Sequence, residues 1–489
     1  MLNRTSFKTD ESFLEKLALG ATGARAVRDD LLRQGHDPIE LERGSMDYKI
    51  WKTIKIKRVR VPDILCLRCA TRIEARAKTK LEITASHSKA DSARGWDQGL
   101  SDGDMLALAL CSKSGPRPID CVASGSVQYV SVKALRRAYA DGKVVEEKPK
   151  GAGEGFELRV TWPSAVASAD GNVVDVSSSR LQYRRASDGR TISLKLARGQ
   201  IPLKPLVKVG DDVRANQVIA SVVPVSASFA CPAGAKADTF AKMLASSSVA
   251  ERYAAAKALG HFKGDKTVAM LTKRVSDDKE HIYVRLEAAA SLVVLGHEAG
   301  MDFIRSVLQG EYFEHRLEAV IILGEIRTEQ ARALLADVLL DAKQPPEIRA
   351  GAAWALGELG QAKSTDALVR AFTEIAEPIR VEAARALRKI IAGTKLHAAE
   401  LLPDSHEEQR AGIAWALSRS GRVDVDELVA ALKNDDTRRW VAYVLGTQDE
   451  KAFIGKVEQL RKADPEVYFA VTVLWRVMSS WVYKLEEYP

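Results

Sequence analysis

The chain lacks the features that mark membrane and secreted proteins. No stretch of 18 apolar residues occurs, which excludes a membrane-spanning helix of ordinary length. The opening residues, MLNRTSFKTDESF, do not form the apolar core of a signal peptide. Cysteine is scarce, with five residues in 489, which argues against a disulfide framework. We therefore expect a reducing, cytoplasmic setting and no membrane partner.

Motifs of several large enzyme classes are also missing. Histidine is sparse, with eight residues, and neither an HxxxH nor an HExxH pattern occurs. There is no Gly-x-Ser-x-Gly elbow, no phosphate-binding P-loop and no dinucleotide fingerprint. Catalytic chemistry is therefore to be sought among carboxylates, basic side chains and the few thiols.

Positive charge is concentrated in the first half of the chain. Residues 236–489 contain 35 Lys and Arg and 38 Asp and Glu, a net charge of −3. Subtraction from the totals of 73 and 65 leaves 38 basic and 27 acidic residues in 1–235, a net charge of +11. This asymmetry indicates a polyanionic partner, first of all DNA, although many basic domains bind no polyanion.

A repeated pattern fills the second half. An Arg stands seven residues before a Leu, with small apolar residues between, and the Leu residues recur every 28 to 33 residues. A period near 30 with two helical patterns per unit is typical of a helical solenoid. The seven Arg–Leu pairs begin at Arg252, Arg285, Arg316, Arg349, Arg380, Arg410 and Arg438.

This part of the chain resembles the HEAT-repeat family in its short bacterial form, and about eight helix pairs are expected over 238–489. The repeated Arg has two interpretations. It can clamp phosphates on a concave face, as in HEAT-like DNA glycosylases, or it can bond carbonyls and acids of the neighbouring unit. The net negative charge of this half favours the second. A protein partner is expected on the solenoid.

Residues 156–230 contain short strand patterns, several Asp-Gly or Gly-Asp turns and almost no helical pattern. Two segments, 162–176 and 205–224, resemble the halves of a barrel-sandwich (lipoyl/biotinyl-like) domain, and residues 207–220 carry the pattern V-x-x-G-D-x-V-x-x-x-Q-x-I-A. Carriers of that family attach their cofactor to a Lys at a hairpin tip. The corresponding turn, residues 169–172, has none, so neither lipoyl nor biotin is expected, and a spacer or docking module is favoured.

The N-terminal segment, residues 1–140, predicts an α/β domain. A helical period runs over 11–34, extended segments are expected at 38–43, 49–61 and 63–84, and MLALALC at 105–111 predicts a buried strand. Within it, Asp63 follows Pro62, and Glu74, Arg76 and Lys78 alternate on one expected strand face. This order resembles the PD-(D/E)XK nuclease superfamily, also called restriction-endonuclease-like. The fold class is therefore multidomain α+β.

The resemblance implies a metal-dependent phosphodiesterase. Asp63 and Glu74 would hold Mg²⁺ or Mn²⁺, and the metal would lower the pKa of an attacking water. Arg76 stands where the family has Lys, with Lys78 two residues later, and both are candidates to stabilise charge in the transition state. An Arg cannot give up a proton. The sequence therefore leaves open an active nuclease, an inactive nuclease-like binding domain, and a basic sheet with two incidental acids.

Six basic residues crowd into the segment KIWKTIKIKRVR, which surrounds Trp51. Such a run suits a phosphate backbone, and it is equally compatible with a solvated strand edge. The candidate nucleic-acid-binding residues are Lys49, Lys52, Lys55, Lys57, Arg58 and Arg60.

The cysteines offer a second chemistry. Cys66 and Cys69 form a CxxC pair, and Cys111 and Cys121 follow in the same segment. Four thiolates can hold a structural Zn²⁺, although the second pair is wider than a knuckle and ordinary buried thiols are the alternative. Cys231 lies in residues 225–237, which are expected to form a soft linker, and it joins neither pair.

Together these patterns predict a metal-dependent DNA endonuclease or DNA-processing protein, with restriction or phage defence as a setting by analogy. The alternative is a non-catalytic adaptor that grips nucleic acid or protein through a degenerate nuclease fold. A third hypothesis is a solenoid similar to bilin lyases or kinase-associated scaffolds, with no nucleic acid involved. The basic first half argues against the third.

Overall fold

The computed structural model describes residues 10–43, 45–46, 59–117, 119–148, 157–431 and 434–447, with four more between 461 and 469. The chain divides into two compact units. Unit 1 comprises Met1–Arg274 with Lys279–Val284, and unit 2 comprises Val275–Asp278 with Arg285–Pro489. No helix in the described part of the chain has the length and apolar character needed to cross a bilayer.

The N-terminal part of unit 1 is built on a five-stranded mixed sheet in the order β1-β2-β3-β5-β6. The first three strands run antiparallel, β5 lies parallel to β3, and β6 returns antiparallel to β5. The strands are β1 (Pro38–Glu40), β2 (Ile64–Cys66), β3 (Arg72–Lys78), β5 (Met105–Lys113) and β6 (Cys121–Ser131). The expected buried strand at 105–111 thus forms the first seven of the nine residues of β5.

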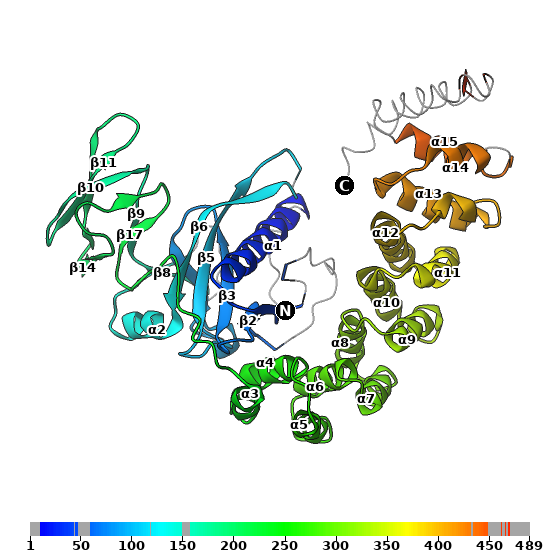
Figure 1. Ribbon diagram of the computed structural model, residues 1–489, viewed down its shortest axis with the longest axis horizontal. Coiled ribbons are helices and arrows are strands. Elements are labelled where there is room, and N and C mark those ends of the chain that lie inside the picture. Colours follow the sequence, from blue (N-terminus) through cyan, green and yellow to red (C-terminus); the bar gives the residue numbers. More distant parts are fainter. Residues whose placement is uncertain are drawn as a thin grey trace. The chain divides into compact units, whose positions relative to one another are not determined.

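Helix α1 (Asp10–Arg33) lies across one face of this sheet (Figure 1). Its apolar period buries Ala24, Val27 and Leu31 against the strands. Gly23 allows the closest approach, because a Cβ at this position would stand 2.7 Å from the Cβ of Ala77. Gly35 then ends the helix at φ +81°, the left-handed conformation of a glycine C-cap.

The connection from β3 to β5 contributes a second sheet. Strand β4 (Ile83–Ser88) pairs antiparallel along its whole length with β8 (Glu157–Trp162), and β7 (Val145–Glu147) adds to the other edge of β8. The indole of Trp162 is buried and donates to the Leu135 carbonyl of α2 (Val132–Ala140) at 3.0 Å. Residues 157–162, expected to open the middle domain, are therefore built into a sheet with the N-terminal segment.

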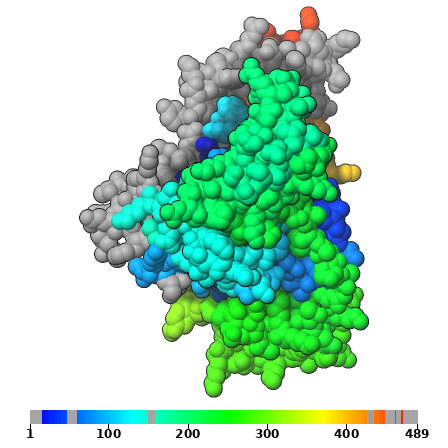
Figure 2. All heavy atoms as spheres, turned by 90° about the vertical axis from the view of Figure 1, so that its left-hand side faces the viewer, coloured from blue at the N-terminus to red at the C-terminus, as the bar shows by residue number. Residues whose placement is uncertain are grey.

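The middle of the chain folds into two small sheets that enclose one apolar core. Figure 2 shows the surface of these residues in green, beside the cyan residues of α2. Their orders are β12-β11-β10-β16 and β15-β17-β9, and a short pair, β13-β14, lies beside them. The strands are β9 (Ser164–Val166), β10 (Gly171–Val176), β11 (Arg180–Arg185), β12 (Thr191–Lys195), β13 (Ala197–Arg198), β14 (Ile201–Pro202), β15 (Lys204–Pro205), β16 (Asp212–Val213) and β17 (Val218–Ser221). The expected all-β character is observed.

The segment that follows β17 runs back along the N-terminal sheet. Ser226 exchanges backbone hydrogen bonds with Tyr129 of β6, at 2.7 and 3.1 Å. Further on, the Gly234 and Ala235 amides donate to the Arg68 carbonyl at 3.1 and 2.9 Å. This segment, expected to be a soft linker, is thus fixed to the turn between β2 and β3.

Helices occupy the described chain from residue 237 onward, in pairs that match the repeat period. The last helices of unit 1 are α3 (Ala237–Leu244), α4 (Val249–Leu259) and α5 (Asp265–Val275). Those that follow are α6 (Ile282–Val294), α7 (Glu298–Leu308), α8 (Phe313–Leu323), α9 (Glu329–Leu340), α10 (Pro346–Leu359), α11 (Thr365–Arg370), α12 (Glu377–Gly393), α13 (Glu407–Arg419), α14 (Val425–Ala431) and α15 (Arg438–Gly446).

Candidate functional site

Asp63 immediately precedes β2 and turns its side chain toward β3. Its carboxylate accepts a hydrogen bond from the Ala75 amide at 2.8 Å, and only 8% of the residue is exposed. The pKa of Asp63 is raised well above its usual value, first by burial, then by Glu74 and then by Glu42. The Ala75 amide and Arg76 oppose this rise. A buried acid under this repulsion is a group that a cation would stabilise.

Glu74 on β3 is the second predicted acid, and it lies close enough to Asp63 to act on its charge. Its side chain is 16% exposed and forms an ion pair with Arg76 at 2.8 Å. Glu74 and Arg76 stand two residues apart on β3, so their side chains share a face of the sheet. The structure therefore brings Asp63, Glu74 and Arg76 together.

Glu42 is a third acid at this place, and sequence reasoning missed it. It follows β1, whose continuation pairs with the strand of Asp63 through the bond from the Leu41 amide to the Asp63 carbonyl at 2.7 Å. The signal was present in Glu40-Leu41-Glu42, an acid-apolar-acid stretch at the end of an expected strand. Carboxylates are donors suited to a divalent cation such as Mg²⁺. Among the described residues, however, the side chains gathered closely enough to hold an ion are His36, Cys66, Cys69 and Cys231, and not these three acids.

Lys78 is not brought to the carboxylates. Its ammonium group donates to the carbonyl and hydroxyl oxygens of Thr84, at 2.9 and 2.7 Å. Burial, followed by the charges of Arg76 and Arg159, lowers the pKa of Lys78 to about 8. The cationic group beside the acids is therefore the guanidinium of Arg76.

Most of the predicted basic run lies outside the described residues, namely Lys49, Lys52, Lys55, Lys57 and Arg58. Arg60 is described, and its guanidinium donates to the Gly95 carbonyl at 3.1 Å. This contact is with the backbone of the β4–β5 connection.

The four cysteines expected to share a zinc ion are not brought together. Cys66 and Cys69 gather instead with His36 and Cys231, and the ligand atoms of these four residues all lie within 4.8 Å of one another. The strand register explains the difference. Ile73 of β3 pairs with Met105 at the start of β5, and Lys78 pairs with Leu110. Cys111 therefore lies six residues, or roughly 20 Å, along β5 from Met105. Cys121 begins β6, beside that same far end.

The two thiols of the CxxC pair differ in acidity. A hydrogen bond to Cys69 and burial raise the pKa of Cys66 to about 12. The same bond lowers the pKa of Cys69 to about 7. Cys66 therefore holds its proton more tightly than Cys69 does.

The repeated Arg residues of the helical half are bound within the repeats. Arg252 forms a bidentate pair with Glu280, and Arg285 donates to the Val275 carbonyl at 2.8 Å. Arg410 donates to the Leu402 carbonyl at 2.9 Å. These contacts fit the interpretation in which the Arg bonds to carbonyls and acids of the neighbouring unit, so these side chains serve packing.

Arg349 is the repeated Arg whose expected contribution to the stability of unit 2 can be tested by substitution. It is 5% exposed and donates to the Leu339 carbonyl at 2.8 Å and to Glu374 at 3.0 Å. Arg349→Met is expected to lower the free energy of unfolding by about 2 kcal/mol, because the buried carbonyl loses a charged donor. Urea denaturation measures the change. The control is Arg370→Met, whose exposed partner Asp366 is 3.9 Å away, and a shift within about 0.5 kcal/mol is expected there. Equal losses in both would contradict a special role for Arg349.

Comparison with known proteins bears on the helical half. The family model described as HEAT repeats matches residues 237–312 and 301–388. A search of curated proteins found no match. With the helix pairs described above, the family model identifies HEAT repeats in the C-terminal half of the chain.

Solved structures with likeness to the chain include helical repeat proteins. The complex of CpcE and CpcF of phycocyanin lyase from Nostoc sp. PCC7120 is 19% identical, with 50% of this chain and 94% of that chain covered and a TM-score of 0.24. The archaeal HEAT-like repeats protein from Thermococcus onnurineus NA1 is 18% identical, with 44% and 97% covered and a TM-score of 0.22. Human deoxyhypusine hydroxylase is 18% identical, with 50% and 86% covered and a TM-score of 0.18.

Proposed function

We propose that this protein is a metal-dependent DNA nuclease or DNA-processing protein, with a HEAT solenoid that binds a partner protein or positions the substrate. The observation that carries the proposal is the buried Asp63 carboxylate beside β3, on which the charges of Glu74 and Glu42 act, with Arg76 paired to Glu74 at 2.8 Å. The order of elements also supports it: a helix, an antiparallel trio of strands, and a further strand parallel to the third. This is the context in which a PD-(D/E)XK motif is meaningful.

The residues divide the chemistry between them. Mg²⁺ or Mn²⁺, held by Asp63 and Glu74 with Glu42 nearby, would polarise the scissile phosphate and supply a water of lowered pKa. Arg76 would stabilise negative charge that develops on the phosphate oxygens. Its pairing with Glu74 keeps the guanidinium beside that position.

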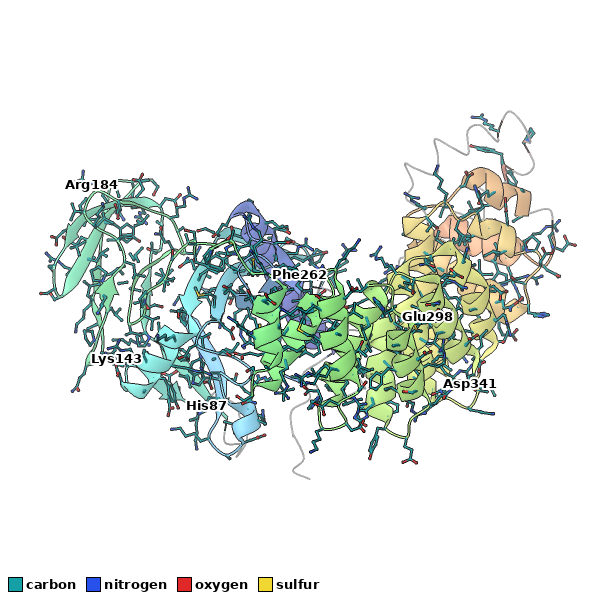
Figure 3. The ribbon with its side chains drawn as sticks, turned by 60° about the horizontal axis from the view of Figure 1, so that its bottom comes forward. His87, Lys143, Arg184, Phe262, Glu298 and Asp341 are labelled. Atoms are coloured by element: carbon teal, nitrogen blue, oxygen red, sulfur yellow. The ribbon has the colours of Figure 1, made fainter. Side chains whose placement is uncertain are left out.

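Exposed cations elsewhere in unit 1 suit a nucleic-acid partner. Arg184 projects outward from β11 (Figure 3), and Arg180 lies directly opposite Lys195 on β12, both exposed. Like charges directly opposite each other on a sheet are unfavourable, and Asp175 of β10, 3.5 Å from Arg180, offsets part of this repulsion. A phosphate backbone would add further negative charge, and it is the polyanion that a net charge of +11 in residues 1–235 favours.

A protein partner on the solenoid is supported by exposed apolar side chains in the turns that precede two of the repeats. Tyr312, directly before α8, is 66% exposed, and Ile375, before α12, is 96% exposed. Apolar and aromatic side chains at such positions are typical anchors of protein interfaces.

The alternative is a non-catalytic adaptor, and one observation favours it. The lysine that the motif requires is absent from the acidic site, since Arg76 occupies its position and Lys78 is bound to Thr84. Without an ammonium group there, the fold can bind a phosphate and still fail to cleave it.

The test is incubation of the purified protein with supercoiled plasmid and Mg²⁺ or Mn²⁺. Asp63→Ala is expected to lower the rate of cleavage by a factor on the order of 10³, since it removes a metal ligand. Asp141→Ala, an exposed acid that follows α2 and pairs with Lys143 at 2.8 Å, is the matched control and is expected to cleave as the wild type does. DNA retention that weakens with salt, without cleavage by any form, would favour the adaptor. Neither cleavage nor retention would refute both.

A further inference from the structure

Four metal-binding side chains from distant parts of the chain meet at the end of β2. His36 follows α1, Cys66 ends β2, Cys69 lies in the turn toward β3, and Cys231 belongs to the segment that joins β17 to α3. They are separated by 30, 3 and 162 residues in sequence. We propose that His36, Cys66, Cys69 and Cys231 form a structural Zn²⁺ site.

The distances fit one tetrahedral ion. A zinc ion bonds sulfur at about 2.3 Å and imidazole nitrogen at about 2.0–2.1 Å, which places tetrahedral ligand atoms roughly 3.5–3.8 Å apart. The sulfurs of Cys66 and Cys231 are 3.9 Å apart, and the Cys69 sulfur is 3.7 Å from Nδ1 of His36. A disulfide would require about 2.05 Å between sulfurs. The arrangement is therefore that of ligands around an ion.

The turn that carries Cys69 and leads from β2 into β3 has the backbone of a metal knuckle. Ala70 holds φ at +58°, a left-handed conformation uncommon for Ala, and its amide donates to the Cys66 carbonyl at 2.9 Å. The Asp37 amide points at the Cys66 sulfur from 3.4 Å. Donation from an amide to sulfur stabilises a thiolate, the form that binds a metal.

The imidazole is oriented for the same purpose. Nε2 of His36 lies 3.3 Å from the Phe229 carbonyl, and the Phe229 ring packs on the imidazole at 4.5 Å. A carbonyl only accepts, so Nε2 carries the proton and Nδ1 presents its lone pair toward Cys69. Metal-bound histidines commonly donate their other ring N–H in this way.

The number and type of ligands indicate the metal and its role. Three thiolates and one imidazole match structural zinc, and a site with four protein ligands leaves no position for a substrate. Two ligands come from the N-terminal sheet, one follows α1, and one comes from the segment 222–236. The ion would tie that segment to the sheet and close a loop of 162 residues, which restricts the unfolded chain.

Metal analysis of the full chain, purified under reducing conditions and dialysed against a weak chelator, tests this site. About one zinc per chain is expected. Cys231→Ser is expected to retain about a tenth or less, because loss of a ligand weakens binding by more than the 10–100-fold that outer hydrogen-bond changes cost. Cys121→Ser, at the start of β6 outside the group, should retain the full zinc content.

A second pair of variants separates ligation from misfolding. His36→Cys offers a sulfur in place of nitrogen and should keep the zinc, whereas His36→Ala should lose it, with far-UV circular dichroism compared for both. Cobalt substitution should give the visible bands of a tetrahedral sulfur-rich site in wild type and in His36→Cys. Zinc retained by Cys231→Ser, iron in place of zinc, or a metal-free wild type with all five thiols reactive or with a Cys66–Cys231 disulfide would overturn the proposal. None of these readouts depends on DNA cleavage.

Discussion

Arg72→Met is expected to lower the free energy of unfolding of unit 1 by about 3–5 kcal/mol, because it leaves a buried carboxylate without its cation. Arg72 is 1% exposed and forms a bidentate pair with Asp104, at 2.9 and 2.6 Å. The same guanidinium donates to the hydroxyl of Ser101 at 2.8 Å and lies 3.8 Å from Glu251 of α4. The residue thus joins the start of β3, the start of β5 and the first repeat. Urea or thermal denaturation measures the loss.

Two further measurements distinguish this mechanism from a simple loss of packing. Burial already raises the pKa of Asp104 above its usual value, with Arg72 opposing that rise. An acid with a raised folded-state pKa favours the folded state below that pKa, so the deficit of Arg72→Met should shrink as the pH falls toward about 4. Adding Asp104→Leu should recover much of the loss at neutral pH.

The control for Arg72 is Arg136→Met. Arg136 forms ion pairs with Asp97 and Asp102 at 2.7 and 2.8 Å, but its side chain is 35% exposed. Solvent compensates such pairs, and a loss of about 1 kcal/mol or less is expected. A pH-independent deficit in Arg72→Met, or equal losses in the two variants, would contradict the argument from burial.

Arg76→Lys is expected to raise the rate of metal-dependent DNA cleavage by about 10–100-fold. A lysine can exchange a proton with the attacking water, whereas an arginine cannot, and a positioned acid or base typically contributes about 10²–10⁴-fold. The expected gain stays at or below the lower limit of that range because a lysine side chain is shorter than an arginine side chain. The lysine must also reach past Glu74, which now pairs with Arg76 at 2.8 Å. Initial rates on supercoiled plasmid with Mn²⁺ measure the change.

Arg117→Lys is the matched substitution, since Arg117 pairs with Asp120 at 2.9 Å in the turn between β5 and β6. It should leave the rate unchanged. A rate that falls in Arg76→Lys would show that the guanidinium itself is required. No cleavage by wild type or Arg76→Lys, with DNA still bound, would favour the adaptor.

Local patterns predicted the fold where structure depends on neighbours in sequence. The repeat period gave the helix pairs, the 3.6-residue period gave α1, and the apolar run at 105–111 gave β5. The extended segment expected at 63–84 is three strands, because the CxxC turn and the connection at 79–82 interrupt it. The partner of β4 could not be foreseen, since it lies about 70 residues further along the chain.

The same distinction holds for the sites. Asp63, Glu74 and Arg76 were predicted from a motif resemblance carried by two neighbouring strands, and the alternation that puts Glu74 and Arg76 on one face is local. Glu42 was missed because its proximity depends on how β1 pairs with the strand of Asp63. His36 and Cys231 were missed for the same reason, since only tertiary folding brings them to the CxxC turn. Lys78 was assigned to the acids by alternation alone, which does not reveal that Thr84 holds its ammonium group.

The pairing of β4 with β8 has a consequence for dissecting this protein. A protease cut anywhere in residues 149–156 would leave two fragments joined by a six-residue antiparallel ladder and by the buried Trp162. Expressing residues 156–230 alone would instead strip β8 of β4 and expose an unpaired edge, which is prone to aggregation. Fragments designed for crystallography or binding assays should therefore keep everything from α1 to Val284, the last residue of unit 1.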